Sequence, residues 1–367
     1  MLCLVAATLQ ELVGDLGICS RISGDLFAAC VRYTKPSLPA ELLGGFNRRI
    51  MQFHLPFEFT SSFGIYAVDD PALPTDVMMD RAALAQKSIK GSYITRLAYY
   101  DDTMNARVLE EQSITAQMET ALRNGQFVPF LQPKVDYLSG RVVGAEALVR
   151  WFHPDMGMIA PATFIPLFER NGFISKLDPY IWEQVCLLLH TWTEAGRSCL
   201  PISVNVSRLD LQNLNILQIM CDLIARYDIP PALLHLEITE TAYVDNPALL
   251  NKALASLRAE GFIIEMDDFG SGFSSLNILR DAPVDILKLD TMFVSDGRQD
   301  ARGAEILRSV IGLAQSLHLG LIAEGVESKD VAEQLADMGC GHMQGYFFSK
   351  PVSVDAFLSL LDAKHQS

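Results

Sequence analysis

A chain of 367 residues, half of them hydrophobic, is long enough to bury a full core and to form one large and one smaller domain. Its formal net charge of −15 argues against general affinity for polymeric nucleic acid or for an anionic membrane surface. No apolar run reaches the roughly 18 residues that a membrane helix needs, and the opening MLCLVAATLQELVGD meets acid and glycine too soon for a secretory signal, so we expect a cytoplasmic location. The seven cysteines include no closely spaced pair, which argues against a zinc knuckle or a disulfide framework.

Residues 1–102 contain RISGDLFAACVRY, a predicted strand FGIYAV and the stretch MMDRAALAQKSIKGS. This region resembles the second half of a GGDEF domain, the diguanylate cyclase fold, with SGDLF (23–27) at the place of the signature. The signature lacks its first glycine and its acidic fourth residue, and the family's first strand, with its metal-binding aspartate, would precede Met1. The resemblance therefore implies a degenerate, partial domain that serves regulation or dimerisation and not cyclase activity.

Residues 103–125 are expected to form a linking helix. Within them, MNARVLEEQSITAQMETALRNG carries apolar residues at helical spacing, including Val108, Ile114, Met118 and Leu122, and ends at a glycine.

From residue 126 to residue 367, short β-branched runs alternate with longer amphipathic stretches, the pattern of repeated βα units on a parallel sheet. Strands are predicted near residues 127–132, 142–149, 202–207, 233–239, 262–268, 285–290, 320–325 and 342–346. Several of the helical stretches between them end at a glycine. Eight strands with intervening helices over this length predict an α/β fold, a (β/α)8 TIM-like barrel, preceded by a smaller, incomplete α+β region.

Polar residues interrupt almost every predicted strand, although buried parallel strands are normally runs of Val, Ile and Leu. They are Glu146, Asn205, Glu237, Asp267, Asp268, Lys288, Glu324 and Gln344. Except for Glu146, which sits deeper, they fall at or near the C-terminal strand ends, where the catalytic groups of such barrels gather. Any one of them is explained equally well as a cap or as a satisfied core polar group. Together they predict a site, because carboxylates that converge on one barrel mouth must be neutralised.

Oxygen donors without His or Cys favour Mg²⁺, Mn²⁺ or Ca²⁺ over zinc or copper. Asp267 can then bridge two cations while Asp268 holds the second, an arrangement suited to in-line phosphoryl displacement. Two other interpretations stay open at this point. An Asp after a strand often caps a helix and Gly-Ser-Gly is ordinary turn chemistry, while a strand lysine such as Lys288 can form a Schiff base with a carbonyl substrate. The Schiff base leaves the carboxylates unexplained.

Seven strings occur in one order along the chain: EALVRW (146–151), NVS (205–207), LEITE (236–240), DDFGSGFSSL (267–276), KLD (288–290), AEGVE (323–327) and QGY (344–346). They resemble the EAL family of cyclic di-GMP phosphodiesterases over about residues 115–362. The resemblance implies a barrel that binds two Mg²⁺ or Mn²⁺ ions and hydrolyses cyclic di-GMP to linear pGpG, by in-line attack of a metal-bound water on one phosphodiester.

The resemblance also implies roles for individual residues. One ion would be held by Glu146, Asn205, Glu237 and Asp267, and the other by Asp267, Asp268 and Glu324. The catalytic residues would be Glu324 as general base, Lys288 beside the nucleophilic water, Asp268, and Glu240, which steadies the loop after the aspartate pair. The substrate would be bound by Gln132, Arg150, Asp290 and Gln344. For Arg150 and Gln132 the alternatives are a surface salt bridge and a turn hydrogen bond.

The loop residues Gly270, Ser271, Gly272 and Ser274 are all present. Their presence favours an active enzyme over the alternative, an inactive EAL receptor that binds cyclic di-GMP and signals to a partner. EAL domains commonly pair through helices near this loop, so the resemblance implies a homodimer.

Glu265 departs from the family, which often has a small residue at this position. It precedes Asp267 by two residues, so it points to the same side of its strand, one layer deeper in the barrel. Such a buried acid needs a partner or a proton, and a neighbouring polar group such as Lys288 is a candidate partner.

Overall fold

The structure is a computed structural model that describes residues 1–33, 35–53, 59–90, 95–213, 215–244, 247–269, 280–289 and 301–364. It contains two compact units, residues Met1–Ile114 and Thr115–Ser367. The boundary falls within helix α4 (Asp102–Arg123), in the segment where a linking helix is expected. No described helix is long and apolar enough to cross a membrane.

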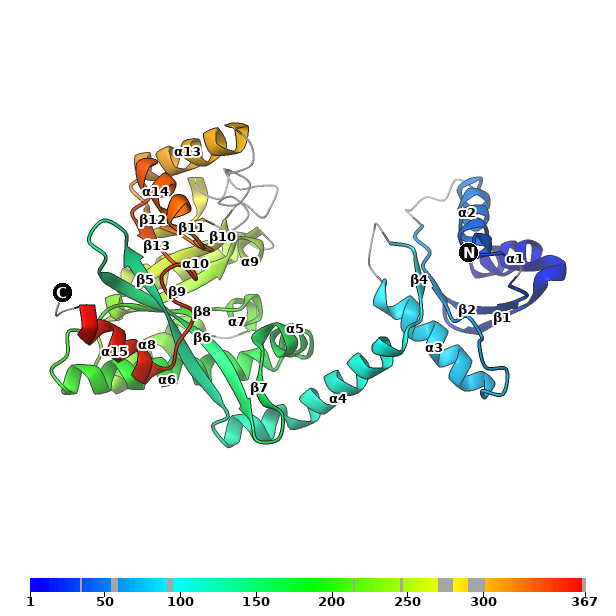
Figure 1. Cartoon of the computed structure of the whole chain (residues 1–367), viewed down its shortest axis with the longest axis horizontal. Helices are drawn as coiled ribbons and strands as arrows, with labels where there is room; N and C mark the ends of the chain where they lie inside the picture. Colours follow the sequence, from blue (N-terminus) through cyan, green and yellow to red (C-terminus); the bar gives the residue numbers. More distant parts are fainter. Residues whose placement is uncertain are drawn as a thin grey trace. The chain divides into compact units, whose positions relative to one another are not determined.

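The first unit combines helices with two small sheets (Figure 1). Its elements before α4 are α1 (Leu2–Val13), η1 (Gly14–Leu16), β1 (Gly17–Ser23), β2 (Leu26–Val31), α2 (Leu38–Met51), β3 (Phe63–Ile65), α3 (Thr75–Ser88) and β4 (Leu97–Tyr99). Strands β1 and β2 form an antiparallel hairpin, and β3 pairs with β4 in parallel. Val5, Phe46 and Ile50 form a buried cluster, against which Phe27 of β2 and Phe63 of β3 pack. Both small sheets therefore share one apolar core.

The second unit is a closed barrel with helices around it (Figure 1). Its strands are β5 (Phe127–Asp136), β6 (Val142–His153), β7 (Gly157–Ile159), β8 (Ile202–Asn205), β9 (Leu234–Thr239), β10 (Ile263–Phe269), β11 (Ile286–Leu289), β12 (Gly320–Ala323) and β13 (His342–Met343). Its helices are α5 (Pro161–Asn171), α6 (Ile174–Glu194), α7 (Arg208–Asn213), α8 (Ile216–Tyr227), η2 (Pro231–Leu233), α9 (Glu240–Val244), α10 (Pro247–Ala259), α13 (Ala301–Ser316), α14 (Lys329–Asp337) and α15 (Val354–Lys364).

The sheet runs in the order β5-β13-β12-β11-β10-β9-β8-β6, and β5 also pairs with β6, which closes an eight-stranded barrel. Strand β7 adds to the outer part of β6. The eight strands predicted from the sequence are confirmed. The expectation that all of them run in parallel is wrong, because β5 is antiparallel to both of its neighbours. The link from β5 to β6 spans only residues 137–141, too short for the crossover that parallel strands require.

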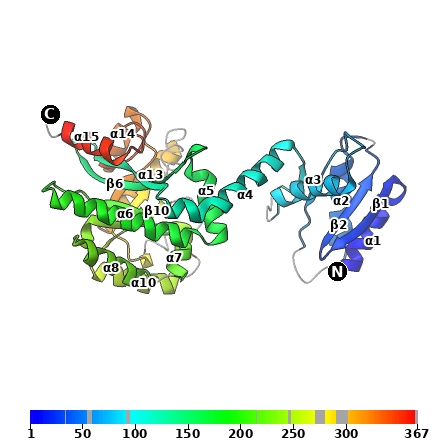
Figure 2. The ribbon, with the colours of Figure 1, turned by 90° about the horizontal axis from the view of Figure 1, so that it is seen from below.

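The helices cover the barrel with apolar stripes. Helix α6 buries Leu177, Ile181, Val185 and Leu189, which recur every four residues on one face. Seen from below, α6, α8 and α10 lie along one side of the barrel (Figure 2), and the contacts of α8 with both α6 and α10 join them.

An aromatic cluster fixes α5 to the ends of β5 and β6. The rings of Phe127, Trp151, Phe164 and Phe168 have centroids 4.9–6.0 Å apart, and all four side chains are fully buried. Such pairs add about 0.5–1.5 kcal/mol each beyond the area that they bury. Since Trp151 follows Arg150 directly, this cluster also anchors the strand that presents Arg150.

Candidate active site

The polar strand residues meet inside the barrel because of strand register. Glu265 of β10 lies beside Glu237 of β9, which lies beside Asn205 of β8. Glu146 of β6 lies beside Ser203 on one flank and Gln132 of β5 on the other. Side chains two residues apart share one face of a strand, so each strand contributes a short ladder of polar groups to the interior.

Four of the predicted carboxylates converge on Lys288. Its Nζ lies 2.7 Å from Glu324 Oε1, 2.8 Å from Glu237 Oε2, 3.1 Å from Asp267 Oδ1 and 3.5 Å from Glu146 Oε2. The Lys288 and Glu237 side chains have no solvent exposure, and the other three carboxylates are at most 17% exposed. One ammonium thus faces four carboxyl groups, which must take up protons or bind further cations to offset their mutual repulsion.

The charges shift the pKa values of the cluster. Burial alone would lower the pKa of Lys288, but Glu146, Glu237 and Glu324 raise it well above its usual range. Burial favours the neutral form of Glu237, yet Lys288 and Lys134 outweigh burial and hold its pKa below its usual range. Burial and the charge of Glu237 raise the pKa of Glu146 to about 7. Burial, with Asp267 and Glu146 nearby, raises the pKa of Glu324 well above its ordinary value.

A chain of amides extends the cluster on the side of Glu146. Asn205 Nδ2 donates to Glu146 Oε1 at 3.4 Å, and Gln344 Nε2 donates to Glu146 Oε2 at 2.5 Å and to Gln132 Oε1 at 3.0 Å. Gln132 Nε2 in turn donates to the carbonyl of Ser349 at 3.2 Å. The Oε1 atom of Gln344 is buried without a hydrogen-bond partner, an acceptor that a cation or a donor would satisfy.

The adjacent aspartates lie on an irregularity of β10. Between Met266 and Phe269 the pairing with β11 shifts, so that two residues of β10 face one residue of β11. Asp268 adopts a left-handed backbone with φ of 55°, and its N–H donates to Asp267 Oδ1 at 2.9 Å. Bulges of this kind commonly occur beside active sites, where they redirect a side chain. Asp267 contacts Lys288 while Asp268 is solvent-exposed at the barrel mouth.

A second buried ammonium lies one layer deeper. Lys134 Nζ of β5 is 2.7 Å from Ser203 Oγ, 3.0 Å from Glu237 Oε1 and 2.6 Å from Glu265 Oε2. Glu265 Oε1 is also 2.6 Å from His235 Nδ1. The candidate pairing of Glu265 with Lys288 is therefore wrong. Glu265 pairs instead with Lys134, which lies across the barrel on the antiparallel strand β5.

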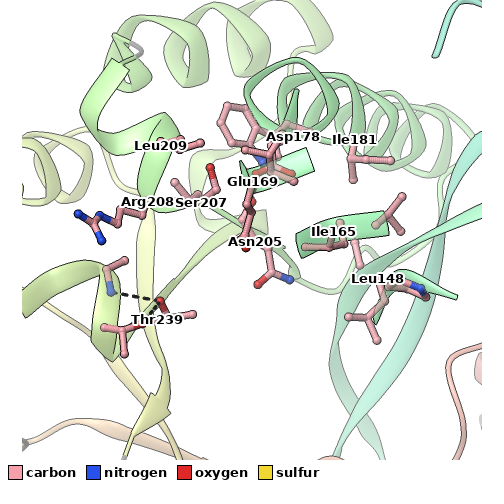
Figure 3. Close-up of a pocket in the computed structure, with 18 of the residues that line it drawn as sticks. Leu148, Ile165, Glu169, Asp178, Ile181, Asn205, Ser207, Arg208, Leu209 and Thr239 are labelled. Atoms are coloured by element: carbon pink, nitrogen blue, oxygen red, sulfur yellow. Dashed lines mark hydrogen bonds between the residues drawn. The ribbon is translucent and has the colours of Figure 1, made fainter. Parts of the chain in front are cut away.

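Two cavities open beside the cluster. The smaller, of about 370 Å³, is lined by Gln132, Glu146, Leu148, Asp267, Glu324 and Gln344, among others. The larger, of about 990 Å³, is lined by Leu148, Arg150, Asn205 and Glu240, with Glu169 and Asp178 from the surrounding helices. Figure 3 shows Asn205, Glu169, Asp178 and Leu148 among the residues that line the larger cavity. Leu148 lines both cavities, so they flank the same part of β6.

Arg150 and Glu240 both line the larger cavity. The guanidinium of Arg150 lies 5.7 Å from the ring centre of Phe130, and burial lowers its pKa. Glu240 begins helix α9 and is 1% exposed. Asp290 and the loop residues Gly270, Ser271, Gly272 and Ser274 lie outside the described residues.

Within the described part of the chain, no three His, Cys, Asp or Glu side chains are already grouped as a ready-made metal site. The carboxylates of Glu146, Glu237, Asp267 and Glu324 instead surround the ammonium of Lys288, whose positive charge reduces their mutual repulsion. The donors are oxygens from carboxylates and amides, the set that Mg²⁺ and Mn²⁺ take. The residues present therefore fit a divalent cation chemically.

Sequence reasoning missed several members of this interior. Lys134 follows Gln132 by two residues, and this spacing was the available signal that it shares the inner face of β5. Asp178 and Asp210 form a carboxyl pair in which Asp210 Oδ2 accepts hydrogen bonds from Ser207 N at 3.1 Å and Ser207 Oγ at 2.6 Å. Nothing in the spacing of these two residues announced that they meet.

A model of the EAL domain family matches residues 115–351. The bifunctional diguanylate cyclase/cyclic di-GMP phosphodiesterase MucR of Pseudomonas aeruginosa is 30% identical over 93% of this chain and 50% of that protein. The cyclic di-GMP phosphodiesterase NbdA of the same species is 29% identical over 99% of this chain and 47% of that protein. The solved PaMucR phosphodiesterase in complex with c-di-GMP is 33% identical, with a TM-score of 0.63 over 67% of this chain and 99% of that chain. The chain spans about half the length of the curated relatives it matches. Since the matched residues make up more than half of the chain and include the carboxylate cluster, the chain belongs to the EAL domain family.

Proposed function

We propose that this chain hydrolyses cyclic di-GMP to linear pGpG at the barrel mouth. The observation that carries the proposal is the convergence of Glu146, Glu237, Asp267 and Glu324 on the buried ammonium of Lys288. Burial of this many carboxylates around one cation costs free energy unless further positive charge is bound. The names of MucR and NbdA and the c-di-GMP complex of PaMucR support this substrate.

Two Mg²⁺ or Mn²⁺ ions would be held by Glu146, Asn205, Glu237, Asp267, Asp268 and Glu324. When bound, such ions activate water for in-line attack and neutralise the charge of the phosphodiester. Glu324 lines the smaller cavity and would accept the proton of the attacking water. Lys288 stays charged within the cluster and would orient that water.

The substrate would be held at the rim of both cavities. Arg150 presents a guanidinium suited to a phosphate, and Gln132 and Gln344 line the smaller cavity with amide groups. The larger cavity beside Arg150 has room for a guanine base. Asp290 and the loop residues Gly270, Ser271, Gly272 and Ser274 are included in this proposed site because their motifs resemble those of the family.

The test is incubation of the protein with cyclic di-GMP and Mg²⁺ or Mn²⁺, followed by chromatographic detection of pGpG. We expect Asp267→Asn and Glu237→Gln to lower turnover by more than about 100-fold while the barrel stays folded, because even partners of metal ligands contribute about 10- to 100-fold. The exposed Asp281, which pairs with Arg280, gives a matched control, and Asp281→Asn should keep normal turnover.

Tight binding of cyclic di-GMP without pGpG would contradict hydrolysis and favour a receptor that signals to a partner. Near-normal turnover by either ligand variant would show that the ligand assignment is wrong.

We also propose that residues 1–102 form a degenerate GGDEF-like region without cyclase activity and that the chain dimerises through its barrel. The hairpin β1–β2 supports the first part, since Gly24, with φ of 51°, lies between its strands where the signature is expected.

A further inference from the structure

The second buried ammonium, Lys134, contacts the same carboxylate that Lys288 contacts. Glu237 Oε2 lies 2.8 Å from Lys288 Nζ, and Glu237 Oε1 lies 3.0 Å from Lys134 Nζ. Ser203 Oγ donates a further hydrogen bond to Oε1. Both carboxylate oxygens of Glu237, a candidate metal ligand, therefore have partners in the barrel interior. The position of Oε1 depends on the position of Lys134.

Lys134 itself is held by Glu265. The Lys134 side chain is 5% exposed, that of Glu265 is fully buried, and the contact of 2.6 Å is the shortest that Lys134 makes. The other oxygen of Glu265 is 2.6 Å from His235 Nδ1, so both oxygens have partners. Glu265 lines neither cavity, and its contact with the residues around Glu237 is made through Lys134.

The charges of the two layers explain why Glu265 matters. The upper layer holds four carboxylates and one ammonium, and the lower layer holds the Lys134 ammonium and the Glu265 carboxylate. With Glu265 present, the lower layer is balanced, and the negative excess of the upper layer remains available to cations. Without it, Lys134 would draw on Glu237 alone and would repel a divalent cation through a medium of low dielectric constant.

We propose that Glu265 is a positioning residue, which neutralises Lys134 and so keeps Glu237 available to divalent cations; this inference rests on the proposed function. The residue touches neither substrate nor metal. By neutralising Lys134, it raises the affinity of the carboxylates around Lys288 for divalent cations.

The experiment measures Mn²⁺ binding by isothermal titration calorimetry on the full chain, alongside unfolding of the metal-free protein. Glu265→Gln keeps the shape of the side chain and removes its charge. We expect the Kd for Mn²⁺ to rise at least about tenfold, with turnover recovering at saturating Mn²⁺, since the loss of one buried charge acts on a doubly charged ion.

The double variant Lys134→Met with Glu265→Gln removes both charges of the lower layer and tests the route of the effect. We expect its Kd for Mn²⁺ to return to within about threefold of the wild-type value, because the local charge is then restored and a buried ion pair can be replaced by uncharged groups. Glu119 and Lys176, 2.5 Å apart on the surface of the same unit, give the matched control. Glu119→Gln should leave Mn²⁺ binding unchanged.

An unchanged Kd in Glu265→Gln, or a double variant no better than the single one, would overturn the inference while the proposed function stands. A wild-type protein that binds no Mn²⁺ would overturn both. If Glu265→Gln alone does not fold, the double variant decides: a Kd within about threefold of wild type supports the inference, and a Kd raised tenfold contradicts it.

Discussion

Asp178 and Asp210 are two acids that meet beside the larger cavity. Burial raises the pKa of Asp178 well above its usual value, and its hydrogen bond with Asp210 and the negative charge of Asp210 add to the effect. The Asp178 carboxyl also accepts a hydrogen bond from the backbone of Ser207, which acts in the opposite direction. Asp178 therefore holds its proton more tightly in the folded chain than in the unfolded chain.

This difference predicts a dependence of stability on pH. Because folded Asp178 stays protonated at pH values where unfolded Asp178, with its ordinary pKa of 3.8, has lost its proton, the free energy of unfolding falls as pH rises from about 4 towards neutrality. Asp178→Asn removes this loss. We expect the variant to be more stable than wild type at pH 7 and equal to it near pH 4.

Urea unfolding at the two pH values measures the difference. The control is Asp222→Asn, on the exposed face of α8, which should track wild type at both values. An equal effect of Asp178→Asn on the free energy of unfolding at pH 4 and pH 7 would contradict a raised pKa of Asp178.

At this scale, the sequence predicted which side chains gather and not which of them pair. The spacing of Glu265 and Asp267 showed that they share one face of β10. The partner of Glu265 is Lys134, which lies 131 positions earlier in the sequence, on the strand that closes the barrel. Predicting whether Glu265 pairs with Lys134 or with Lys288 would require the register of every strand between β5 and β11. A local sequence pattern does not determine that register.

Single elements carry details that a pattern of eight strands leaves out. A strand was predicted at residues 262–268, and β10 covers Ile263–Phe269, one residue further along the chain. The bulge at Asp267 and Asp268 was not predicted, because no pattern of apolar residues marks it. The turn after β5 was the available clue to its direction, because five linking residues cannot accommodate a crossover helix.

The segments after β12 and β13 meet at Gly345. Val326 N donates to the carbonyl of Gln344 at 3.1 Å, and Phe347 N donates to the carbonyl of Val326 at 2.9 Å. A Cβ on Gly345 would lie 2.2 Å from the Val326 oxygen and 2.3 Å from its nitrogen, far inside contact distance. Only a glycine lets these two segments approach, and they carry Glu324 and Gln344.

Gly345→Ala should therefore separate the two segments. We expect a loss of at least about 2 kcal/mol in the free energy of unfolding, and a fall in turnover as Gln344 moves, because the clash is with backbone atoms that cannot rotate away. Gly312→Ala in α13 is the control. A Cβ there meets nothing within 4 Å, so the change should be neutral or stabilising by up to about 1 kcal/mol. Equal effects of the two variants would show that close approach at Gly345 is unimportant.

On the scale of the whole molecule, the chain has two separate apolar cores. The first unit is built around Val5, Phe46 and Ile50, and the second around the barrel and its aromatic cluster. Composition and strand count were sufficient to predict a large barrel and a smaller region before it. The exact boundary was not predictable, because α4 runs through it without a change in amphipathic pattern.

Two cores predict two unfolding transitions in calorimetry. Phe46→Ala should lower the stability of the first unit by about 3–5 kcal/mol through the cavity that it leaves, while hydrolysis of cyclic di-GMP stays within about twofold. Phe164→Ala, in the aromatic cluster of the barrel, should move the other transition and reduce hydrolysis. A single transition shifted equally by both variants would show that the units unfold together.

The reversed direction of β5 determines where the polypeptide enters the barrel. Phe127, the first residue of β5, pairs with Trp151, the residue after Arg150. The last turns of α4 are held in the same region by the contacts of Gln117 with His153 and of Glu119 with Lys176. In a barrel whose first strand runs with the others, the preceding helix would arrive at the opposite, closed end. Here the chain enters β5 beside Arg150, which pairs with Val128, so the N-terminal connection and the proposed phosphate-binding guanidinium share one edge of the barrel.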